Sequence, residues 1–386
     1  MPVSRKRKKS HRSTAAARAE RRRLHTRQVR LMNSLRDLAG AREAGQARRI
    51  GLAHPHAAAL ADRLLESPRS GTALEDEICA LLGPLLTELG DLPAETYVGP
   101  DHLAIALIDE LREQAEQAGP ASDAAAVRAA EVLRAVAAIM PMPLRGRAGV
   151  EVAAPEAAGE VRWTRDRYGS RFAIVAPFTT PEGPVRWYLW DVDACDITPR
   201  PAHAGFYASP EEALAAWQVA AGAFAAGGTS WRRVDDSRLL AGLLPKPEEY
   251  GPLGGETAAQ HAEYHRCRRL AELVLELPRV LVLDPVGTAL DAGPKAFSAW
   301  LRTRPDRPDP EIFLIEELFE SWPSEVPELF DTCSPHRVRA VTTQIRDEFH
   351  DGADDLLELL PAWVTWLADR TGLPAELRDR SLAELD

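Results

Sequence analysis

Three aspartates lie at the end of a strand-like run in the middle of the chain. Asp191, Asp193 and Asp196 close or follow the apolar and aromatic segment 185–192. Clustered carboxylates in this position can hold Mg²⁺ or act as nucleophile and acid. The surrounding sequence predicts a hairpin, whereas such sites usually lie at the ends of parallel strands. We therefore expect no catalytic residue here, and the alternative is an enzyme that uses Asp191, Asp193 or Trp190.

Histidine and cysteine spacings offer metal ligands without completing a site. His261 and His265 lie four residues apart in the string HAEYH, close to Cys267, while Cys333 and His336 form a separate C-x-x-H. A zinc-protease helix needs glutamate directly after its first histidine, and alanine stands there instead. A four-ligand site from these groups needs a fold that the sequence does not reveal. We expect surface histidines and buried cysteines, and predict no metal and no cofactor.

Two further patterns resemble known sites and are better explained by packing. The run 280–284 (VLVLD) precedes Gly287, Gly293 and Lys295, but the glycine spacing does not match a phosphate-binding loop and a proline removes a backbone donor. Trp363 and Trp366, three residues apart, share one side of an expected helix. We expect them in the core, with an aromatic groove for a ligand or partner as the alternative.

The N-terminal arm, residues 1–50, is the most informative feature. It holds 16 Lys and Arg against 3 Asp and Glu, a balance of +13, whereas the rest of the chain holds 31 against 55, a balance of −24. Such a cluster neutralises phosphates and releases counterions, and no aromatic residue is present for base stacking. The predicted nucleic-acid-binding residues are Arg5, Lys6, Arg7, Lys8, Lys9, Arg12, Arg18, Arg21, Arg22 and Arg23.

Other interpretations of the arm remain open. It can be a solvated tail that binds nothing specific or folds against the acidic body, or it can bind an anionic membrane surface. The four cysteines are far apart, which fits a reducing compartment. No apolar run is long enough to span a bilayer, and no apolar core follows the basic N-terminus as it does in a secretory signal. We predict a cytoplasmic protein, and the abundant Arg and Ala suggest a high-GC bacterial genome.

The pattern along the chain predicts a mainly helical protein with a small α+β module. Residues 1–13 are expected to be disordered, and leucines spaced by seven, four and three predict an amphipathic helix from residue 14 to about Gly40. Residues 40–54 look like a linker. The predicted folded parts are a helical domain at 55–140, a small antiparallel sheet plus helix at 160–228, and a helical domain at 256–386.

Within these parts, several helix ends and strands can be placed. Pro55 suits a first helical turn, and Thr72 with Glu75 forms a capping-box pattern. The runs 171–177 and 185–192 predict a hairpin, with 160–164 as a possible third strand. A helix capped at Ser209 should cover one face of the sheet and end at 227–228. Residues 229–255 are expected to be irregular.

Two short segments resemble known proteins. The string LLPAWVTWLADRTGLPAEL is similar to segments of uncharacterised actinobacterial proteins, and GFYASPEEALAAW is similar to the strand-to-helix step of ββ(β)α modules such as the HicB-like antitoxin partners. The second resemblance implies a local α+β module and carries no function with it.

These patterns favour a non-enzymatic binding or regulatory protein. We expect the arm to contact a polyanion, and we expect that polyanion to be nucleic acid. The folded body is expected to recognise another partner. The alternatives are a helical protein–protein interaction scaffold with an incidental tail, and an enzyme with a site near the middle module. The pattern does not predict the oligomeric state.

Overall fold

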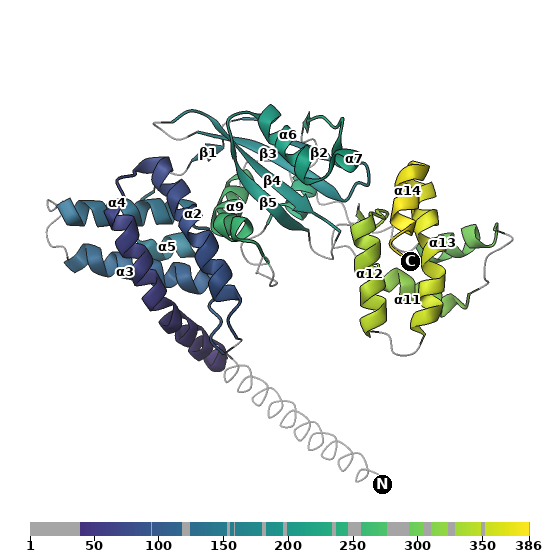
Figure 1. Ribbon diagram of the computed structural model, residues 1–386, viewed down its shortest axis with the longest axis horizontal. Helices are drawn as coiled ribbons and strands as arrows, with labels where there is room; N and C mark the ends of the chain where they lie inside the picture. Colours follow the sequence, from purple (N-terminus) through teal and green to yellow (C-terminus); the bar gives the residue numbers. More distant parts are fainter. Residues whose placement is uncertain are drawn as a thin grey trace, which may run out of the picture.

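The computed structural model describes residues 39–93, 95–117, 124–152, 155–157, 159–179, 183–195, 199–233, 237–245, 256–275, 293–304, 310–322, 329–348 and 352–385. A helical block, a small sheet with helices on both faces, and a second helical block follow one another along the long axis (Figure 1). The prediction of a mainly helical chain with one small antiparallel sheet in its middle is confirmed at this level.

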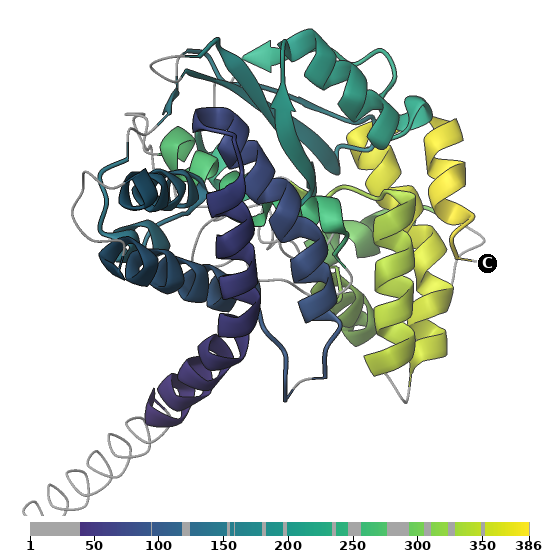
Figure 2. The same ribbon diagram turned by 60° about the vertical axis from the view of Figure 1, so that its left-hand side comes forward.

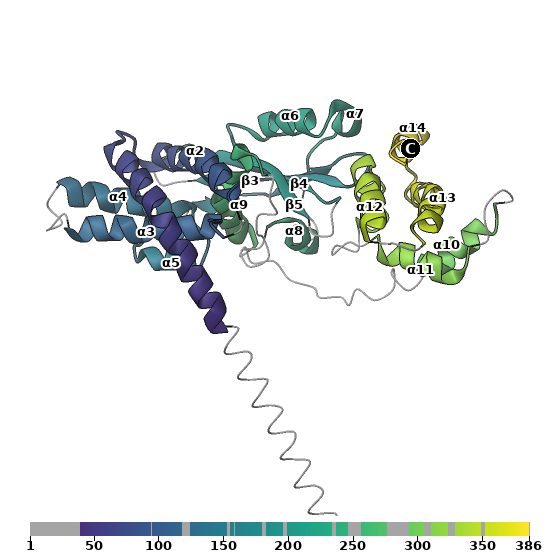
Figure 3. The ribbon, with the colours of Figure 1, turned by 60° about the horizontal axis from the view of Figure 1, so that its bottom comes forward.

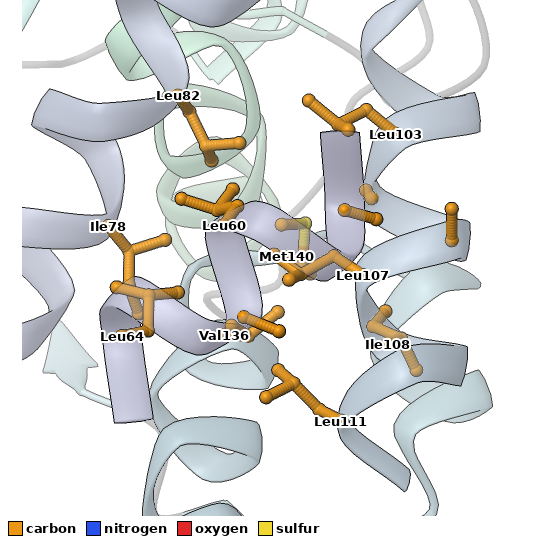
Figure 4. Packing of buried hydrophobic residues seen from close by; sticks show 14 of the residues in the cluster. Leu60, Leu64, Ile78, Leu82, Leu103, Leu107, Ile108, Leu111, Val136 and Met140 are labelled. Atoms are coloured by element: carbon orange, nitrogen blue, oxygen red, sulfur yellow. The ribbon is translucent and has the colours of Figure 1, made fainter. Parts of the chain in front are cut away.

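The first block consists of a helix over residues 39–66 followed by α2 (Gly71–Gly90), α3 (Pro100–Gln117), α4 (Ala124–Ile139) and α5 (Leu144–Ala148). Aliphatic side chains from all of the longer helices meet in its core (Figure 4). Among them Leu64, Ile78, Leu107 and Val136 are completely buried. Burying apolar surface of this kind is the main stabilising contribution in a helical block.

Two predictions for the start of this block are wrong. Residues 40–54 are helical rather than a linker, and Pro55 lies inside the helix instead of in its first turn. The glycines and the proline of this helix disfavour helical structure. Ala53 and Ala57 are fully buried in the core, and this packing stabilises the helix despite those residues. Figure 2 shows this helix running along the block, with its N-terminal end extending beyond it.

Helix α2 begins one residue earlier than its predicted cap. The residue that precedes it is Ser70, whose side chain makes no capping hydrogen bond, and Thr72 lies within the first turn. The helix ends at Gly90. Helix α3 begins at Pro100 and buries one face that includes Leu103 and Leu111.

The central sheet is antiparallel and its strands lie in the order β5-β4-β3-β2-β6, with β1 paired to β3. The predicted hairpin is β3 and β4, and the suggested third strand is β2. The end of β5 falls where the resemblance of GFYASPEEALAAW to a strand-to-helix step implied a strand, whereas no sequence pattern indicated β6 or β1. The strands are β1 (Glu156–Ala157), β2 (Arg162–Arg165), β3 (Arg171–Thr179), β4 (Arg186–Asp193), β5 (Arg200–Tyr207) and β6 (Arg232–Arg233).

Both faces of the sheet are covered, so its central strands are buried on both sides. Figure 3 shows α6 (Pro210–Ala220) and α7 (Ala223–Ala226) on one face, and α8 (Ser237–Leu243) and α9 (Ala258–Leu275) on the other. Leu189 packs toward Trp217 of α6, whereas Trp190, one residue on, packs toward α9. This alternation follows from the two-residue period of a strand.

The cap of α6 is formed as predicted. Ser209 Oγ accepts a hydrogen bond from the Glu212 N–H, and the Glu212 carboxylate accepts one from the Ala208 N–H. The predicted end at 227–228 is wrong, because the helix stops at Ala220. Gly222, at φ 88°, turns the chain into the separate short helix α7. The segment 229–255 also contains β6 and α8 in its described part.

The last block contains α10 (Gly293–Leu301), α11 (Ile312–Glu320), α12 (Pro335–Glu348), α13 (Ala353–Thr371) and α14 (Ala375–Leu382). Trp363 and Trp366 are buried in its aromatic core, with Phe297 within about 5 Å of both ring centroids. The prediction that the two tryptophans belong to the core is confirmed. No helix in the described part of the chain is both long and apolar enough to cross a bilayer.

Candidate binding pocket between the first helical block and the sheet

Helix α9 joins the first block to the sheet and carries an unusual number of buried charges. It packs against α2 and β5, although the sequence had grouped it with the C-terminal helices. Arg266, Arg268 and Arg269 are all buried. Buried cations are stable only when they are paired, and acidic side chains face each of them. Arg268 meets Asp101 and Arg269 meets Glu272, both at 3.1 Å.

Arg266 is the centre of this polar network. Its guanidinium forms ion pairs with Asp76 of α2 and with Glu263 one turn earlier on α9. Tyr188 of β4 donates a hydrogen bond from its hydroxyl to the Glu263 carboxylate at 2.8 Å. One arginine therefore links the helical block, the sheet and α9.

A second arginine reaches the same place from the sheet. Arg186, the first residue of β4, pairs with Asp76 at 3.0 Å. The guanidinium carbons of Arg186 and Arg266 lie 4.0 and 5.2 Å from the centroid of the Phe206 ring. Cation–π attraction at these distances holds both guanidinium groups against the aromatic face.

A cavity opens beside these groups, with about 400 Å³ of unfilled space including its mouth. Its walls come from α2, α4, α9 and the strands, and they are mostly apolar with one carboxyl and two guanidinium groups. The lining residues are Thr72, Glu75, Ala138, Ile139, Pro155, Phe178, Pro184, Arg186, Phe206, Arg266 and Leu270. A concave apolar surface with a few convergent polar groups is the usual form of a small-molecule site.

Glu75 is the titratable group of the pocket. The pKa of its carboxyl is raised from 4.5 to about 7, mainly by burial and in smaller part by neighbouring Asp76. Arg266 and Arg186 act in the opposite direction without cancelling the effect of burial. The carboxyl therefore changes protonation near neutral pH, so it can donate a hydrogen bond to a ligand or accept one. In the sequence, Glu75 is part of a capping-box pattern with Thr72, which indicates no binding role.

His261 and His265 are structural. Both are buried, which corrects the prediction of surface histidines for these two, whereas His336 is exposed as predicted. His261 Nδ1 lies 3.0 Å from Thr87 Oγ1, and burial lowers the pKa of His265 to about 4, so its ring is neutral near pH 7. Neither is brought together with Cys333 or His336 in the described structure. All four cysteines are buried free thiols, as predicted.

Asp191 and Asp193, which the sequence offered as candidate catalytic carboxylates, have different partners and do not form one site. Asp191 is completely buried, accepts two hydrogen bonds from Arg171 and a third from the Trp217 indole N–H. Its oxygens are occupied, so it has no access to a substrate. Asp193 pairs instead with His336 at 3.1 Å. Trp190 is buried and donates its indole hydrogen to the Cys267 carbonyl oxygen.

Several predicted features lie outside the described residues. They include Asp196, the run 280–284 with its first glycine, and the ten predicted nucleic-acid-binding residues of the arm. Comparison with known proteins adds no further assignment, because no family model, curated protein or solved structure matches the chain.

Proposed function

We propose that this is a non-enzymatic binding or regulatory protein whose basic N-terminal arm contacts nucleic acid. The observation that carries the proposal is the segregation of charge, +13 in residues 1–50 against −24 in the remainder. A cationic segment of this density binds phosphates through counterion release, whatever the base sequence. The acidic remainder repels the same polyanion, which confines contact to the arm.

The segment that joins the arm to the folded body supports the proposal that contact with nucleic acid is confined to the arm. Residues 39–49 form the exposed start of the helix over 39–66, and they include Arg42, Arg48 and Arg49. The later turns of that helix are fixed in the core by Ala57 and Leu64. The basic segment is thus continuous with a helix anchored in the body and carries its last cations on solvent-exposed turns.

The test is a binding titration with labelled duplex DNA and single-stranded RNA at 50 and 200 mM salt. The full chain is compared with a chain that starts at residue 39, because removing the whole arm through residue 50 would also remove Ile50, which packs against the core. If about six phosphates are neutralised, affinity should fall roughly 10³-fold between the two salt concentrations. The shortened chain should lose this binding.

A charge-neutralised full chain provides the matched comparison. Replacing Arg5, Lys6, Arg7, Lys8, Lys9 and Arg12 by Gln should weaken binding and flatten the salt dependence, whereas Arg134→Gln, on an exposed position of α4, should change little. Equal binding by all four chains would rule out the arm as the segment that binds nucleic acid. Binding to anionic vesicles in preference to nucleic acid would favour the membrane alternative.

The pocket supports a second candidate function, the binding of a small, largely apolar molecule with one hydrogen-bonding group. Phe178, Phe206 and Leu270 supply the apolar walls, and Glu75 supplies the polar contact. Both arginines are already paired with acids, so they do not provide an unbalanced positive charge for an anion. A thermal-shift screen of neutral aromatic amides and alcohols tests this candidate, with Glu75→Ala expected to abolish any shift found.

A further inference from the structure

Three side chains that can ligate metal meet at the end of β4 opposite the pocket. Asp193 is the last residue of β4, Cys195 follows two residues later, and His336 is the second residue of α12. One carboxylate oxygen, one sulfur and one ring nitrogen from these residues all lie within 4.8 Å of one another. They are the one group of three or more such ligands in the described structure.

Backbone and side-chain contacts hold these groups in place. His336 Nδ1 lies 3.1 Å from one Asp193 oxygen, and the other oxygen accepts a hydrogen bond from the Cys195 N–H at 2.8 Å. Cys195 Sγ lies 2.9 Å from Ser334 Oγ, which also accepts a hydrogen bond from the backbone at the start of α12. The three ligands are therefore preassembled from two separate parts of the chain.

The ligand types select the class of metal. Thiolate, imidazole and carboxylate together suit Zn²⁺, whose tetrahedral ligands lie roughly 3–4 Å apart. Thiolate and carboxylate supply two negative charges that balance a divalent cation. A nucleophilic role for Cys195 is less consistent with the structure, because its sulfur is buried and a substrate would have to reach it.

We propose that Asp193, Cys195 and His336 form a zinc-class metal site that joins the sheet to the C-terminal helical block. Binding forms bonds to one oxygen, one sulfur and one nitrogen, and the thiol proton of Cys195 leaves to solvent. Three protein ligands leave one coordination position for water or a small ligand, and the His336 side chain is 62% exposed, so that position can reach solvent.

The inference is independent of the arm and of the pocket. Sequence spacing does not indicate this site, because the cysteine that lies near His336 along the chain is Cys333, in a C-x-x-H pattern. In the structure the sulfur that lies close to the histidine belongs to Cys195, which is 141 positions away. The metal would add to the contacts that already connect the sheet with the C-terminal block, such as the one between Tyr168 Oη and the Leu377 carbonyl oxygen at 3.4 Å.

The test is a Co²⁺ titration of the metal-stripped full chain, followed by displacement with Zn²⁺. We expect about one equivalent to bind with a thiolate-to-cobalt charge-transfer band in the near ultraviolet. Cys195→Ser should abolish that band, and His336→Ala should weaken binding at least about 10-fold. His336 is exposed, so its variant should keep the far-ultraviolet circular dichroism of the parent chain.

Cys333→Ser is the matched control, because it removes a buried thiol close to His336 along the sequence but outside the proposed ligand set. It should leave both the band and the stoichiometry unchanged. The proposal is overturned if the parent chain binds less than a tenth of an equivalent. It is equally overturned if the charge-transfer band survives Cys195→Ser or disappears in Cys333→Ser.

Discussion

The two helical blocks are attached to the sheet in different ways. The first block shares α9 with the sheet, and the junction contains a buried network in which Arg266 pairs with Asp76 and Glu263. The C-terminal block meets the sheet partly through buried contacts, such as Cys195 Sγ with Ser334 Oγ. Its charged contacts lie nearer the surface, as in the pair of His336 with Asp193 and the ring contact of Arg380 with Phe224. The ionic contacts are therefore buried at one junction and more exposed at the other.

This difference has energetic consequences. A buried ion pair contributes little net stability relative to apolar packing. Removing one partner, however, leaves the other as an uncompensated charge in a medium of low polarity, which is strongly destabilising. Exposed pairs contribute between zero and about 1 kcal/mol. The first block and the sheet should therefore unfold together, whereas single exposed contacts at the C-terminal junction should be removable with small effect.

The largest expected effect comes from Arg266→Ala. Without the guanidinium, the carboxylates of Asp76 and Glu263 lose their buried partner, so the free energy of unfolding should fall by about 3–5 kcal/mol. Urea denaturation followed by circular dichroism measures the change. The control is Arg147→Ala, which breaks the more exposed pair with Asp109 and should change stability by less than about 1 kcal/mol.

The close approach of α2 and α9 gives the second prediction. A Cβ on Gly83 would lie 2.3 Å from the Ala258 carbonyl oxygen, a backbone atom that cannot move alone. Gly83→Ala should thus destabilise the protein by roughly 1–3 kcal/mol. Gly45→Ala, in the exposed part of the helix over 39–66 with nothing near its Cβ, should instead stabilise by about 0.5–1 kcal/mol. Equal effects at the two positions would contradict the tight α2–α9 junction.

The third prediction concerns the pH dependence of the free energy of unfolding that follows from the raised pKa of Glu75, at the junction of the first block and the sheet. The folded protein holds this proton up to about pH 7, whereas an unfolded carboxyl releases it near 4.5. Between these values the folded state binds more protons, so this group makes the free energy of unfolding decrease as pH rises from 4.5 to 7. Glu75→Gln should match the parent chain near pH 4 and be more stable by roughly 1–3 kcal/mol at pH 8. A constant difference between the two stability curves would contradict the raised pKa.

Much of the fold could be predicted because its signals are local. The cap of α6 depends on Ser209 and Glu212, which lie three residues apart, and the strands of the β3–β4 hairpin are adjacent in the sequence. The start of the first block could not be predicted in the same way. There the core positions of Ala53 and Ala57 outweigh the local effect of Pro55, and that advantage exists only once α2, α3 and α4 are in place.

The candidate sites could not be predicted because their members are distant in the sequence. Asp76 and Arg266 are 190 positions apart, and Cys195 and Ser334 are 139 apart. Each residue alone has an ordinary surface or core interpretation. The spacing of His261 and His265 suggests a shared metal ion because both lie on one helix. In the structure they face different partners from distant segments, Thr87 and Asp101, which the spacing does not reveal.

The smallest expected effect tests an exposed contact of the C-terminal junction. The Arg380 guanidinium carbon lies 3.3 Å from the centroid of the Phe224 ring, a cation–π contact at an exposed position. Arg380→Ala should lower the free energy of unfolding by about 0.5–1 kcal/mol, measured by urea denaturation with tryptophan fluorescence. Arg378→Ala, on the same helix and paired with its neighbour Asp379, should change it less. If Arg380→Ala destabilised the protein as strongly as Arg266→Ala, the C-terminal junction would be as integral to the fold as the buried one, and the contrast between them would not hold.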